Sequence, residues 1–497
     1  MMHLIPDILV AALSTRQDIA VTDGAQALTG PQLLRRAGTW TDALTAVSAQ
    51  RVAWRMENGI DWIALDLATL LTGRVAIPIP DFFSPTQVHY VLAASGADTW
   101  IGSAADALPD GFETRLKVAD VPVATTRVAA PPAVHAGTAK ITFTSGTTGD
   151  PKGVCLSAAT MLRTADALRR ELGGLGVQRH LCALPLSLLL ENVAGVYANI
   201  LNGSTLVTPT NGALGLTGSS GVDIARFVRA QQDANPHSLI LVPQLLLALI
   251  AARSFGIALP ESYRFVAVGG GRVAPSLLDQ AVRAGLPVYE GYGLSECGSV
   301  VTLNTPGGRR AGTVGRPLPH VRLEQVDGEL TVAGSAMLGY LGGPAAGTVI
   351  HTGDLGDIDA AGFVSIQGRR RNCFITAFGR NVSPEWVESE LTAEPDIAMA
   401  AVFGEALASN VAVLVTRHDD AAAIAAAVSR VNARLPDYAR IGAWHATDAT
   451  SFRARHCVTA NGRIRRDTVA AVYAEELAAL MPPDTLVSSA AETRHVS

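Results

Sequence analysis

The stretch Ile141–Val154 constrains the fold of this chain more than any other. The apolar, β-branched run Ala139–Phe143 predicts a strand, and the loop that follows is rich in hydroxyl groups and glycines and ends at Lys152. Glycines let backbone N–H groups converge on one point, while hydroxyls and a lysine add donors and positive charge. The pattern predicts a loop that wraps a polyphosphate, although its spacing is not the Walker pattern. A plain, flexible surface loop is the alternative.

The residues before this loop alternate between helical and strand patterns. Apolar residues recur at helical spacing in Pro31–Leu44 and Asp61–Thr72, and short apolar runs at Gln50–Arg55 and Val75–Ile79 indicate strands. Strands separated by helices of about 10–15 residues are typical of parallel α/β layers. The sequence therefore predicts an α/β fold.

The length of the chain, 497 residues, is too great for one ordinary core, so we expect at least two domains. From Gly312 the pattern becomes β-rich, and the basic break Gly368–Cys373 precedes a smaller α/β pattern. We predict a large N-terminal domain at 1–367, a hinge at 368–373, a small C-terminal domain at 374–481 and a disordered tail at 482–497.

The composition excludes several classes of function. Hydrophobic residues make up 48% of the chain, charged residues 17%, and the net charge is −5, with no basic stripe for nucleic acid or an anionic membrane. Pro6 and Asp7 argue against a signal peptide, and no apolar run reaches the roughly 20 residues of a membrane span. The five scattered cysteines suggest reduced thiols, and the histidines lack zinc-ligand spacing. We expect a cytoplasmic protein without a nucleic-acid partner or integral membrane segment.

Two more stretches punctuated by glycine follow predicted strands. The first is the turn Gly269-Gly270-Gly271, where missing side chains would let a flat ring approach the backbone. With Ala274 and the downstream Glu290 it also fits a dinucleotide fingerprint, and a plain tight turn is a third reading. The second, Glu290–Cys297, is predicted to be a polar loop.

The loop Thr144–Gly153 resembles the phosphate loop of the adenylate-forming superfamily, which comprises acyl-CoA synthetases, adenylation domains of nonribosomal peptide synthetases and beetle luciferases. Four further stretches match the superfamily pattern in the expected order, so the resemblance covers roughly residues 28–480, and it is strongest to acyl-CoA synthetases and fatty-acid–CoA ligases. It implies an α/β fold with a large N-terminal AMP-binding domain of layered α/β subdomains plus a β-rich part. It also implies a small, mobile C-terminal α+β domain.

The resemblance assigns roles to the glycine-punctuated stretches. The turn at Gly269 would lie beside the adenine, and Tyr292-Gly293-Leu-Ser295-Glu296 is similar to the superfamily's Tyr-Gly-x-Thr-Glu. By that match Tyr292 stacks on the adenine, Ser295 contacts the α-phosphate or the substrate carboxylate, and Glu296 holds Mg²⁺. One carboxylate suffices, because Mg²⁺ keeps most of its waters.

Two later stretches complete the resemblance. In His351-Thr-Gly-Asp354 the aspartate would accept hydrogen bonds from both ribose hydroxyls, and Arg369 would be the cation beside ribose and phosphate. Asn372 stands where many relatives have a hinge Asp. The loop at Gly379 would swing toward the site for thioester formation, and Ser383-Pro-Glu385 also fits a helix cap.

The chain departs from the superfamily pattern at two positions. Arg463 occupies the place of a lysine that reaches the acyl carboxylate and the nucleotide. Arginine keeps the positive charge, but as a wide, flat fork. Leu188, in the predicted apolar helix Ser187–Leu201, stands where many acyl-CoA synthetases carry an aromatic residue or a histidine. This replacement favours an apolar acid over an amino acid.

We therefore predict an ATP-dependent ligase that activates a carboxylic acid, fatty or otherwise apolar, as an acyl-adenylate and transfers it to a thiol with release of AMP. Cofactors would be ATP and Mg²⁺, with coenzyme A or the phosphopantetheine of a separate acyl carrier protein as acceptor. An impaired ATP- or acyl-binding homologue acting as partner or sensor, and a nicotinamide oxidoreductase, are the alternatives. The predicted catalytic residues are Thr148, Lys152, Ser295, Glu296 and Arg463, and the predicted cofactor-binding residues are Thr144, Ser145, Gly146, Thr147, Gly149, Gly269, Gly270, Gly271, Tyr292, Gly293, Asp354, Arg369 and Gly379.

Overall fold

The fold was analysed in a computed structural model that describes residues 6–103, 107–144, 151–217, 221–377, 379–459 and 462–480. The predicted tail at 482–497 lies outside these residues. The chain divides into two compact units. The large unit comprises Met1–Thr352 and Gly356–Ile366, and the small unit comprises Gly353–Leu355 and Gln367–Ser497.

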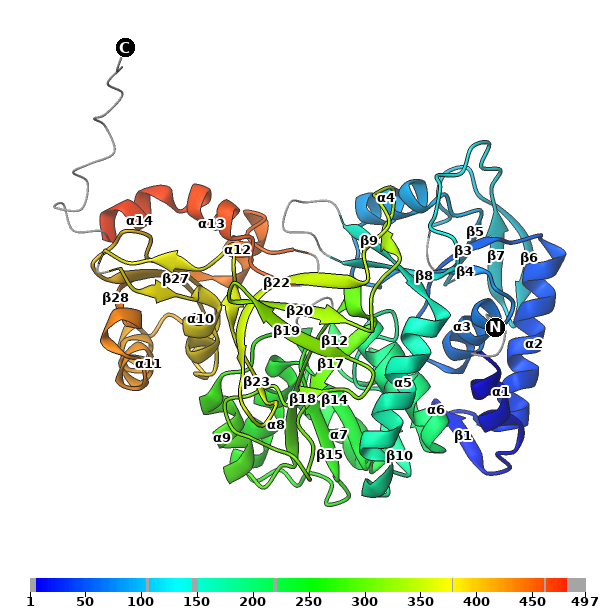
Figure 1. Ribbon diagram of the computed structural model, residues 1–497, viewed down its shortest axis with the longest axis horizontal. Coiled ribbons are helices and arrows are strands. Elements are labelled where there is room, and N and C mark those ends of the chain that lie inside the picture. Colours follow the sequence, from blue (N-terminus) through cyan, green and yellow to red (C-terminus); the bar gives the residue numbers. More distant parts are fainter. Residues whose placement is uncertain are drawn as a thin grey trace, which may run out of the picture. The chain divides into compact units, whose positions relative to one another are not determined.

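Two extended sheets form the frame of the large unit (Figure 1). The eight-stranded sheet has the order β21 (Gly339–Tyr340), β9 (Lys152–Ser157), β8 (Thr138–Thr144), β4 (Val75–Pro78), β3 (Arg51–Arg55), β5 (Thr99–Gly102), β7 (Val121–Thr125), β6 (Glu113–Val118). The nine-stranded sheet has the order β18 (Arg316–Pro317), β17 (Ser299–Leu303), β16 (Val288–Leu294), β15 (Phe265–Val268), β14 (Ser238–Leu241), β10 (Arg179–Leu181), β11 (Thr205–Val207), β1 (Ile19–Thr22), β2 (Ala27–Thr29). Their central strands are parallel, which confirms the predicted α/β class.

Helices separate consecutive parallel strands, as the sequence pattern predicts. They are α1 (Asp7–Ser14), α2 (Gly30–Ala46), α3 (Ile60–Leu71), α4 (Pro85–Ser95), α5 (Ala158–Leu172), α6 (Ala198–Asn202), α7 (Ile224–Ala234), α8 (Pro243–Ser254) and α9 (Pro275–Arg283). One buried apolar cluster contains residues of both sheets, among them Trp54 of β3 and Leu206 of β11. The two sheets therefore share a core.

The predicted long helix Ser187–Leu201 is wrong in detail. The structure has a π-helix, η2 (Glu191–Tyr197), which continues directly into α6. Leucine-rich composition gives no sign of this change in helical period, since it depends on buried polar partners described below.

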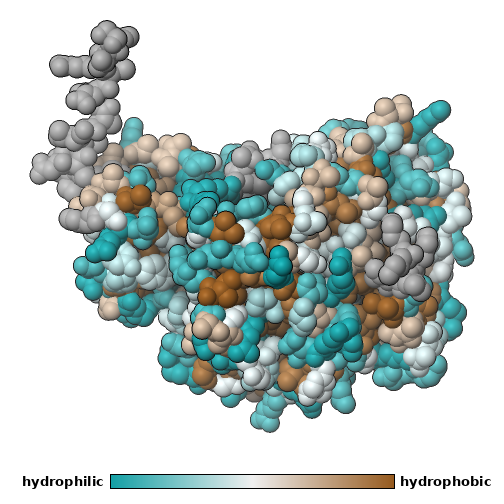
Figure 2. All heavy atoms as spheres, viewed as in Figure 1, coloured by the Kyte–Doolittle hydropathy of each residue, from teal (hydrophilic) through white to brown (hydrophobic). Residues whose placement is uncertain are grey.

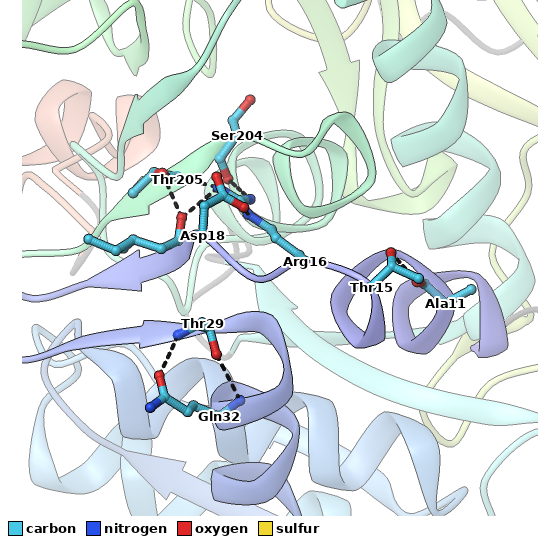
Figure 3. A network of polar contacts seen from close by, with 9 residues as sticks. Ala11, Thr15, Arg16, Asp18, Thr29, Gln32, Ser204 and Thr205 are labelled. Carbon is cyan, nitrogen blue, oxygen red and sulfur yellow. Dashed lines mark hydrogen bonds and ion pairs between the residues drawn. The ribbon is translucent and has the colours of Figure 1, made fainter.

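The N-terminal segment is tied to the nine-stranded sheet by a buried arginine (Figure 3). The Arg16 guanidinium donates to the backbone oxygens of Ser204 and Ile19 and to Thr205 Oγ1, and it pairs with Asp18 at 3.2 Å. Nearby, Thr29 and Gln32 form a reciprocal capping box at the start of α2.

The β-rich texture from Gly312 corresponds to a four-stranded sheet in the order β19 (Arg322–Val326), β20 (Glu329–Ala333), β22 (Val349–Ile358), β23 (Val364–Arg369). The small unit has a three-stranded sheet in the order β26 (Ile397–Phe403), β27 (Asn410–Thr416), β28 (Ile441–Asp448). Its helices are α10 (Pro384–Thr392), α11 (Ala421–Arg434), α12 (Ala449–Ala454), α13 (Arg466–Val472) and α14 (Ala474–Leu480), and a short hairpin joins β24 (Phe374–Ile375) to β25 (Asn381–Val382).

The surface in view is mostly hydrophilic, with apolar residues in scattered groups (Figure 2). Within the described ranges, no helix combines the length and apolar character that crossing a membrane requires.

Candidate active site

The predicted phosphate loop is framed by two antiparallel strands. β8 ends at Thr144 and β9 begins at Lys152, and these two residues face each other across the ladder. Thr144 Oγ1 donates to the Lys152 carbonyl oxygen at 3.5 Å. Both ends of the loop are therefore fixed by the same ladder. The predicted site residues Ser145, Gly146, Thr147, Thr148 and Gly149 lie outside the described residues.

Lys152 and Glu296 converge on an aromatic residue that the sequence analysis missed. The Tyr340 hydroxyl donates to Glu296 Oε1 at 2.7 Å, and Lys152 Nζ lies 5.8 Å from the centre of the Tyr340 ring. Tyr340 lies on β21, which pairs with β9 beside the loop, opposite Val154. A lone tyrosine in a β-rich stretch carries no local signal of this role. The structure thus brings a cation, a carboxylate and a phenol from three distant segments into one cluster.

The predicted polar loop Glu290–Cys297 is wrong. β16 continues through Tyr292 and Gly293 to Leu294, and Ser295–Cys297 form a 3₁₀ turn. β16 pairs with β17, and the register shifts between Tyr292 and Gly293. A Cβ on Gly293 would lie 1.9 Å from the Ser299 carbonyl oxygen. Glycine is therefore required by the close approach of two strands at this irregularity, a feature common beside active sites.

The glycine turn Gly269–Gly271 follows the carboxyl end of β15, in the middle of the nine-stranded sheet. Open α/β sheets bind ligands at this edge. Gly270 has a φ of +76°, and a Cβ placed there would lie 3.6 Å from Val242 Cγ1 and 3.8 Å from Leu190 Cδ2. Pro243 lies 3.8 Å from the same position on Gly271. Apolar side chains therefore flank the turn.

The segment around Leu188 is anchored from a distant strand–helix connection. Asn58 Nδ2 donates to the Leu184 carbonyl oxygen at 2.9 Å, and the Leu186 N–H donates to Asn58 Oδ1 at 2.8 Å. Leu190 follows directly and reaches the glycine turn. This part of the chain, singled out by its leucines, thus lies at the candidate site.

Glu290 lies beside the glycine turn, because it pairs with Val268 across β15 and β16. Burial raises the pKa of Glu290 to about 8, and the positive charge of Arg272 opposes this shift. The carboxyl is therefore mostly protonated at neutral pH and can donate a hydrogen bond at the edge of the site.

Replacing Glu290 by glutamine is expected to stabilise the protein at alkaline pH. The folded-state pKa is raised, so the native protein binds the extra proton and loses stability as pH rises from about 4.5 to about 8. Glutamine removes this loss, with a gain of roughly 4 kcal/mol at pH 8 that disappears near pH 4.5. Urea unfolding of both proteins at pH 5, 7 and 8.5 measures the difference, and an equal gain at all three values would contradict the assignment.

The small unit holds four of the predicted residues. Asp354 is 4% exposed, and its Oδ1 lies 2.8 Å from Arg369 Nε. Gly379 has a φ of +69° with open space at its Cβ position, and its N–H donates to the Thr376 carbonyl oxygen. Arg463 closes a turn in which its N–H donates to Thr459 Oγ1 at 3.1 Å.

The predicted helix cap at Ser383 is only partly right. Pro384 begins α10, but the Ser383 side chain makes no capping bond. Its hydroxyl donates to Glu385 Oε2 at 3.1 Å instead, and the Asn372 amide donates to Oε1 of the same carboxylate. Glu385 therefore connects α10 to Asn372, at the position predicted to be a hinge.

Comparison with known proteins decides between the readings of these motifs. The profile of the AMP-binding enzyme family matches residues 10–341, about two thirds of the chain, and that of the AMP-binding enzyme C-terminal domain matches residues 372–482. The chain belongs to the AMP-binding enzyme family. The resemblance to adenylate-forming enzymes is thereby confirmed, and the dinucleotide reading of the glycine turn loses its support.

Relatives of this AMP-binding enzyme include several ligases. The chain is 29% identical over 459 residues to a long-chain-fatty-acid–CoA ligase of Mycobacterium bovis, covering 74% of this chain and 76% of that one. It is 31% identical over 285 residues to a 2-succinylbenzoate–CoA ligase of Bacillus licheniformis, covering 54% and 56%.

Solved structures share the fold across nearly the whole chain. An anthranilate CoA ligase in complex with anthranoyl-AMP has a TM-score of 0.77 at 20% identity, covering 96% of this chain and 98% of that one. An o-succinylbenzoate coenzyme A synthetase from Bacillus subtilis, in complex with ATP and magnesium ion, has a TM-score of 0.70 at 22% identity, covering 93% and 98%. The predicted combination of a large and a smaller α/β domain is confirmed.

Proposed function

We propose that this AMP-binding enzyme activates a carboxylic acid with ATP and Mg²⁺, forming an acyl-adenylate and pyrophosphate, and then transfers the acyl group to a thiol with release of AMP. The observation that carries the proposal is the cluster of Lys152, Tyr340 and Glu296 beside the ends of the phosphate loop. A cation beside a hard oxygen ligand is what the binding of a metal-bound polyphosphate requires, and this supports the proposal.

Residues of the two units would bind different parts of the ATP·Mg²⁺ complex. Glu296 would hold Mg²⁺, whose charge neutralises the phosphates, and the Tyr340 hydroxyl, which donates to Glu296 Oε1, would orient the carboxylate for the ion. Lys152 and Thr144 would hold the phosphates, and Tyr292 and the glycine turn would hold the adenine. Asp354 and Arg369 would hold the ribose. Chemistry of this kind rests on positioning and on stabilising charge.

An apolar acid fits the surroundings of the glycine turn. Leu190 and Val242 would lie in van der Waals contact with a Cβ added at Gly270, and Pro243 with one added at Gly271. Leu188 lies in the same anchored segment as Leu190. Apolar side chains beside the turn that would hold the adenine favour an adjoining hydrocarbon over a charged amino acid. The relatives described above are named as ligases of fatty, aryl and succinylbenzoic acids, and we assign this chain to a fatty or other apolar acid.

The second half-reaction would use the small unit. We propose a hinge at 368–373 between a domain at 1–367 and one at 374–481, with rotation about Arg371–Asn372 bringing Gly379 to the site. Coenzyme A is the proposed acceptor, since the relatives are named as CoA ligases, and a carrier-protein phosphopantetheine is the other thiol of the same chemistry.

Product analysis with a panel of acids tests substrate and acceptor together. Purified protein, ATP and Mg²⁺ are incubated with fatty acids of increasing length, aryl acids or amino acids, and with either coenzyme A or a phosphopantetheinyl carrier protein. We expect AMP and a thioester with an apolar acid and coenzyme A. A thioester formed only with amino acids, or with the carrier alone, would contradict the assigned acid or acceptor.

Arg463 distinguishes an active ligase from an impaired homologue. If its charge stabilises the transition state, Arg463→Met should lower acyl-adenylate formation by about 100-fold, while Arg463→Lys should stay within about tenfold of the native rate. Both variants should keep the native melting temperature and ATP affinity. An Arg463→Met enzyme with the native rate would show that the arginine contributes no such charge, as in the impaired homologue.

A further inference from the structure

The π-helix η2 aims two of its side chains at a single carboxylate. Asn192 Nδ2 donates to Asp66 Oδ2 at 2.9 Å, and the Tyr197 hydroxyl donates to the same oxygen at 2.6 Å. In an α-helix, residues five apart point about 140° away from each other. The wider π-turn brings this pair to one side, and π-turns of this kind are frequent at functional sites. The change of helical period is therefore what completes the contact with Asp66 on α3.

A buried lysine joins the same group. Lys140 Nζ pairs with Asp66 Oδ1 at 2.7 Å and donates to Tyr197 Oη at 3.2 Å and to Asn192 Oδ1. The lysine is 2% exposed, and the three partners are equally buried. Burial lowers the pKa of Lys140, an effect that Asp66 opposes. We call Asp66, Lys140, Asn192 and Tyr197 the buried quartet.

Lys140 is on β8, the strand that ends at the phosphate loop. It pairs with Ala76 on β4 and with Leu156 on β9, and the β8–β9 register shifts between Thr138 and Lys140. Beyond this irregularity the ladder runs regularly to the pair Thr144 and Lys152. An irregularity of this kind disrupts the ladder locally and bends the strand that carries it. The quartet holds β8 immediately after the shift.

The residue before Asn192 points toward the other sheet. Glu191 Oε1 lies 2.9 Å from His180 Nε2 on β10, and its Oε2 accepts from the Leu184 N–H at 3.1 Å. His180, Cys182 and Glu191 place three potential ligand atoms within 4.8 Å of one another, but these bonds already use both carboxylate oxygens. Glu191 and Asn192, consecutive residues of η2, thus contact β10 of the nine-stranded sheet and β8 of the eight-stranded sheet, respectively.

We propose that Lys140 is a positioning residue for ATP: through the buried quartet it fixes β8 against η2, and so sets where Thr144 and Lys152 meet the outer phosphates. This inference rests on the proposed function for the identity of the nucleotide. It requires no contact between Lys140 and ATP. It predicts a defect confined to ligands that carry the β- and γ-phosphates.

The test replaces the ion pair by a neutral pair of similar shape, Lys140→Met with Asp66→Asn, so that Asn192 and Tyr197 keep an acceptor. Calorimetry measures the affinity of the folded variant for ATP·Mg²⁺ and for AMP, and thermal melting confirms that it is folded. We expect the dissociation constant for ATP to rise about tenfold and that for AMP to change less than about twofold. If the role of Lys140 were purely structural, the affinities for ATP and for AMP would fall together.

Arg16→Met is the matched control. It also removes a buried cation of the large unit, but Arg16 ties the N-terminal segment to β11 and touches neither β8 nor β9 (Figure 3). It should lower the melting temperature and leave the ratio of ATP to AMP affinity unchanged. An unchanged ratio in the Lys140 variant, or an equal change in the Arg16 variant, would overturn the inference. A selective loss of ATP affinity in a protein that activates no acid would sustain it and refute the proposed function instead.

Discussion

Replacing Glu296 by glutamine is expected to lower the rate of acid-dependent acyl-adenylate formation by about 100-fold or more. The amide keeps the shape of the side chain and can still accept a hydrogen bond from Tyr340, but it loses the negative charge that a hard divalent ion requires. The dependence of the rate on Mg²⁺ concentration should shift to much higher concentrations. Initial rates over a titration of Mg²⁺ at saturating ATP measure both effects.

Tyr340→Phe is the control for this variant. It removes the hydroxyl that orients Glu296 and keeps the ring beside Lys152. The rate of acyl-adenylate formation should therefore fall about tenfold, while the ion stays bound. A Glu296→Gln enzyme with native Mg²⁺ dependence would contradict the role of Glu296. A larger loss in Tyr340→Phe than in Glu296→Gln would instead assign the tyrosine a direct contact with the substrate.

Replacing Gly195 by alanine is expected to destabilise the protein by about 3 kcal/mol. A Cβ at this position would lie 2.0 Å from Glu191 Oε1 and 3.0 Å from His180 Nε2, so the buried Glu191 carboxylate would have to leave its partners. An uncompensated carboxylate in the core is costly. Urea unfolding followed by tryptophan fluorescence measures the loss.

Gly38→Ala is the matched substitution for Gly195. Gly38 lies in α2, with no atom within 4 Å of its Cβ position, so alanine should raise stability by about 0.5–1 kcal/mol through its better helix propensity. A Gly195→Ala protein as stable as Gly38→Ala would show that Glu191 can move without cost. It would also remove the basis for η2 as a fixed link between the two sheets.

The local sequence pattern was sufficient to predict the helices and strands that form the layers of the fold. The helices predicted at Pro31–Leu44 and Asp61–Thr72 correspond to α2 and α3, and most of their termini agree to within one residue. The prediction succeeds because apolar periodicity and capping residues act locally. The strand before the phosphate loop was found for the same reason, since its β-branched run is buried. Ordered motifs then indicated the family.

Contacts between distant segments account for what the sequence did not reveal. Tyr340 acts through a strand pairing with β9, nearly 190 residues earlier, which no local pattern encodes. The glycines after Glu290 predict a loop, yet Gly293 is required there because β17 approaches closely. The π-turn depends on Asp66 and His180, which lie on other elements.

Isotope exchange between ATP and pyrophosphate in the presence of a carboxylic acid is the direct test of acid activation by this enzyme, because it reports acyl-adenylate formation before any thiol takes part. We expect exchange that requires Mg²⁺ and an apolar acid, proceeds without coenzyme A and is lost in Glu296→Gln. No exchange with any fatty, aryl or amino acid, in a protein that still binds ATP, would contradict it.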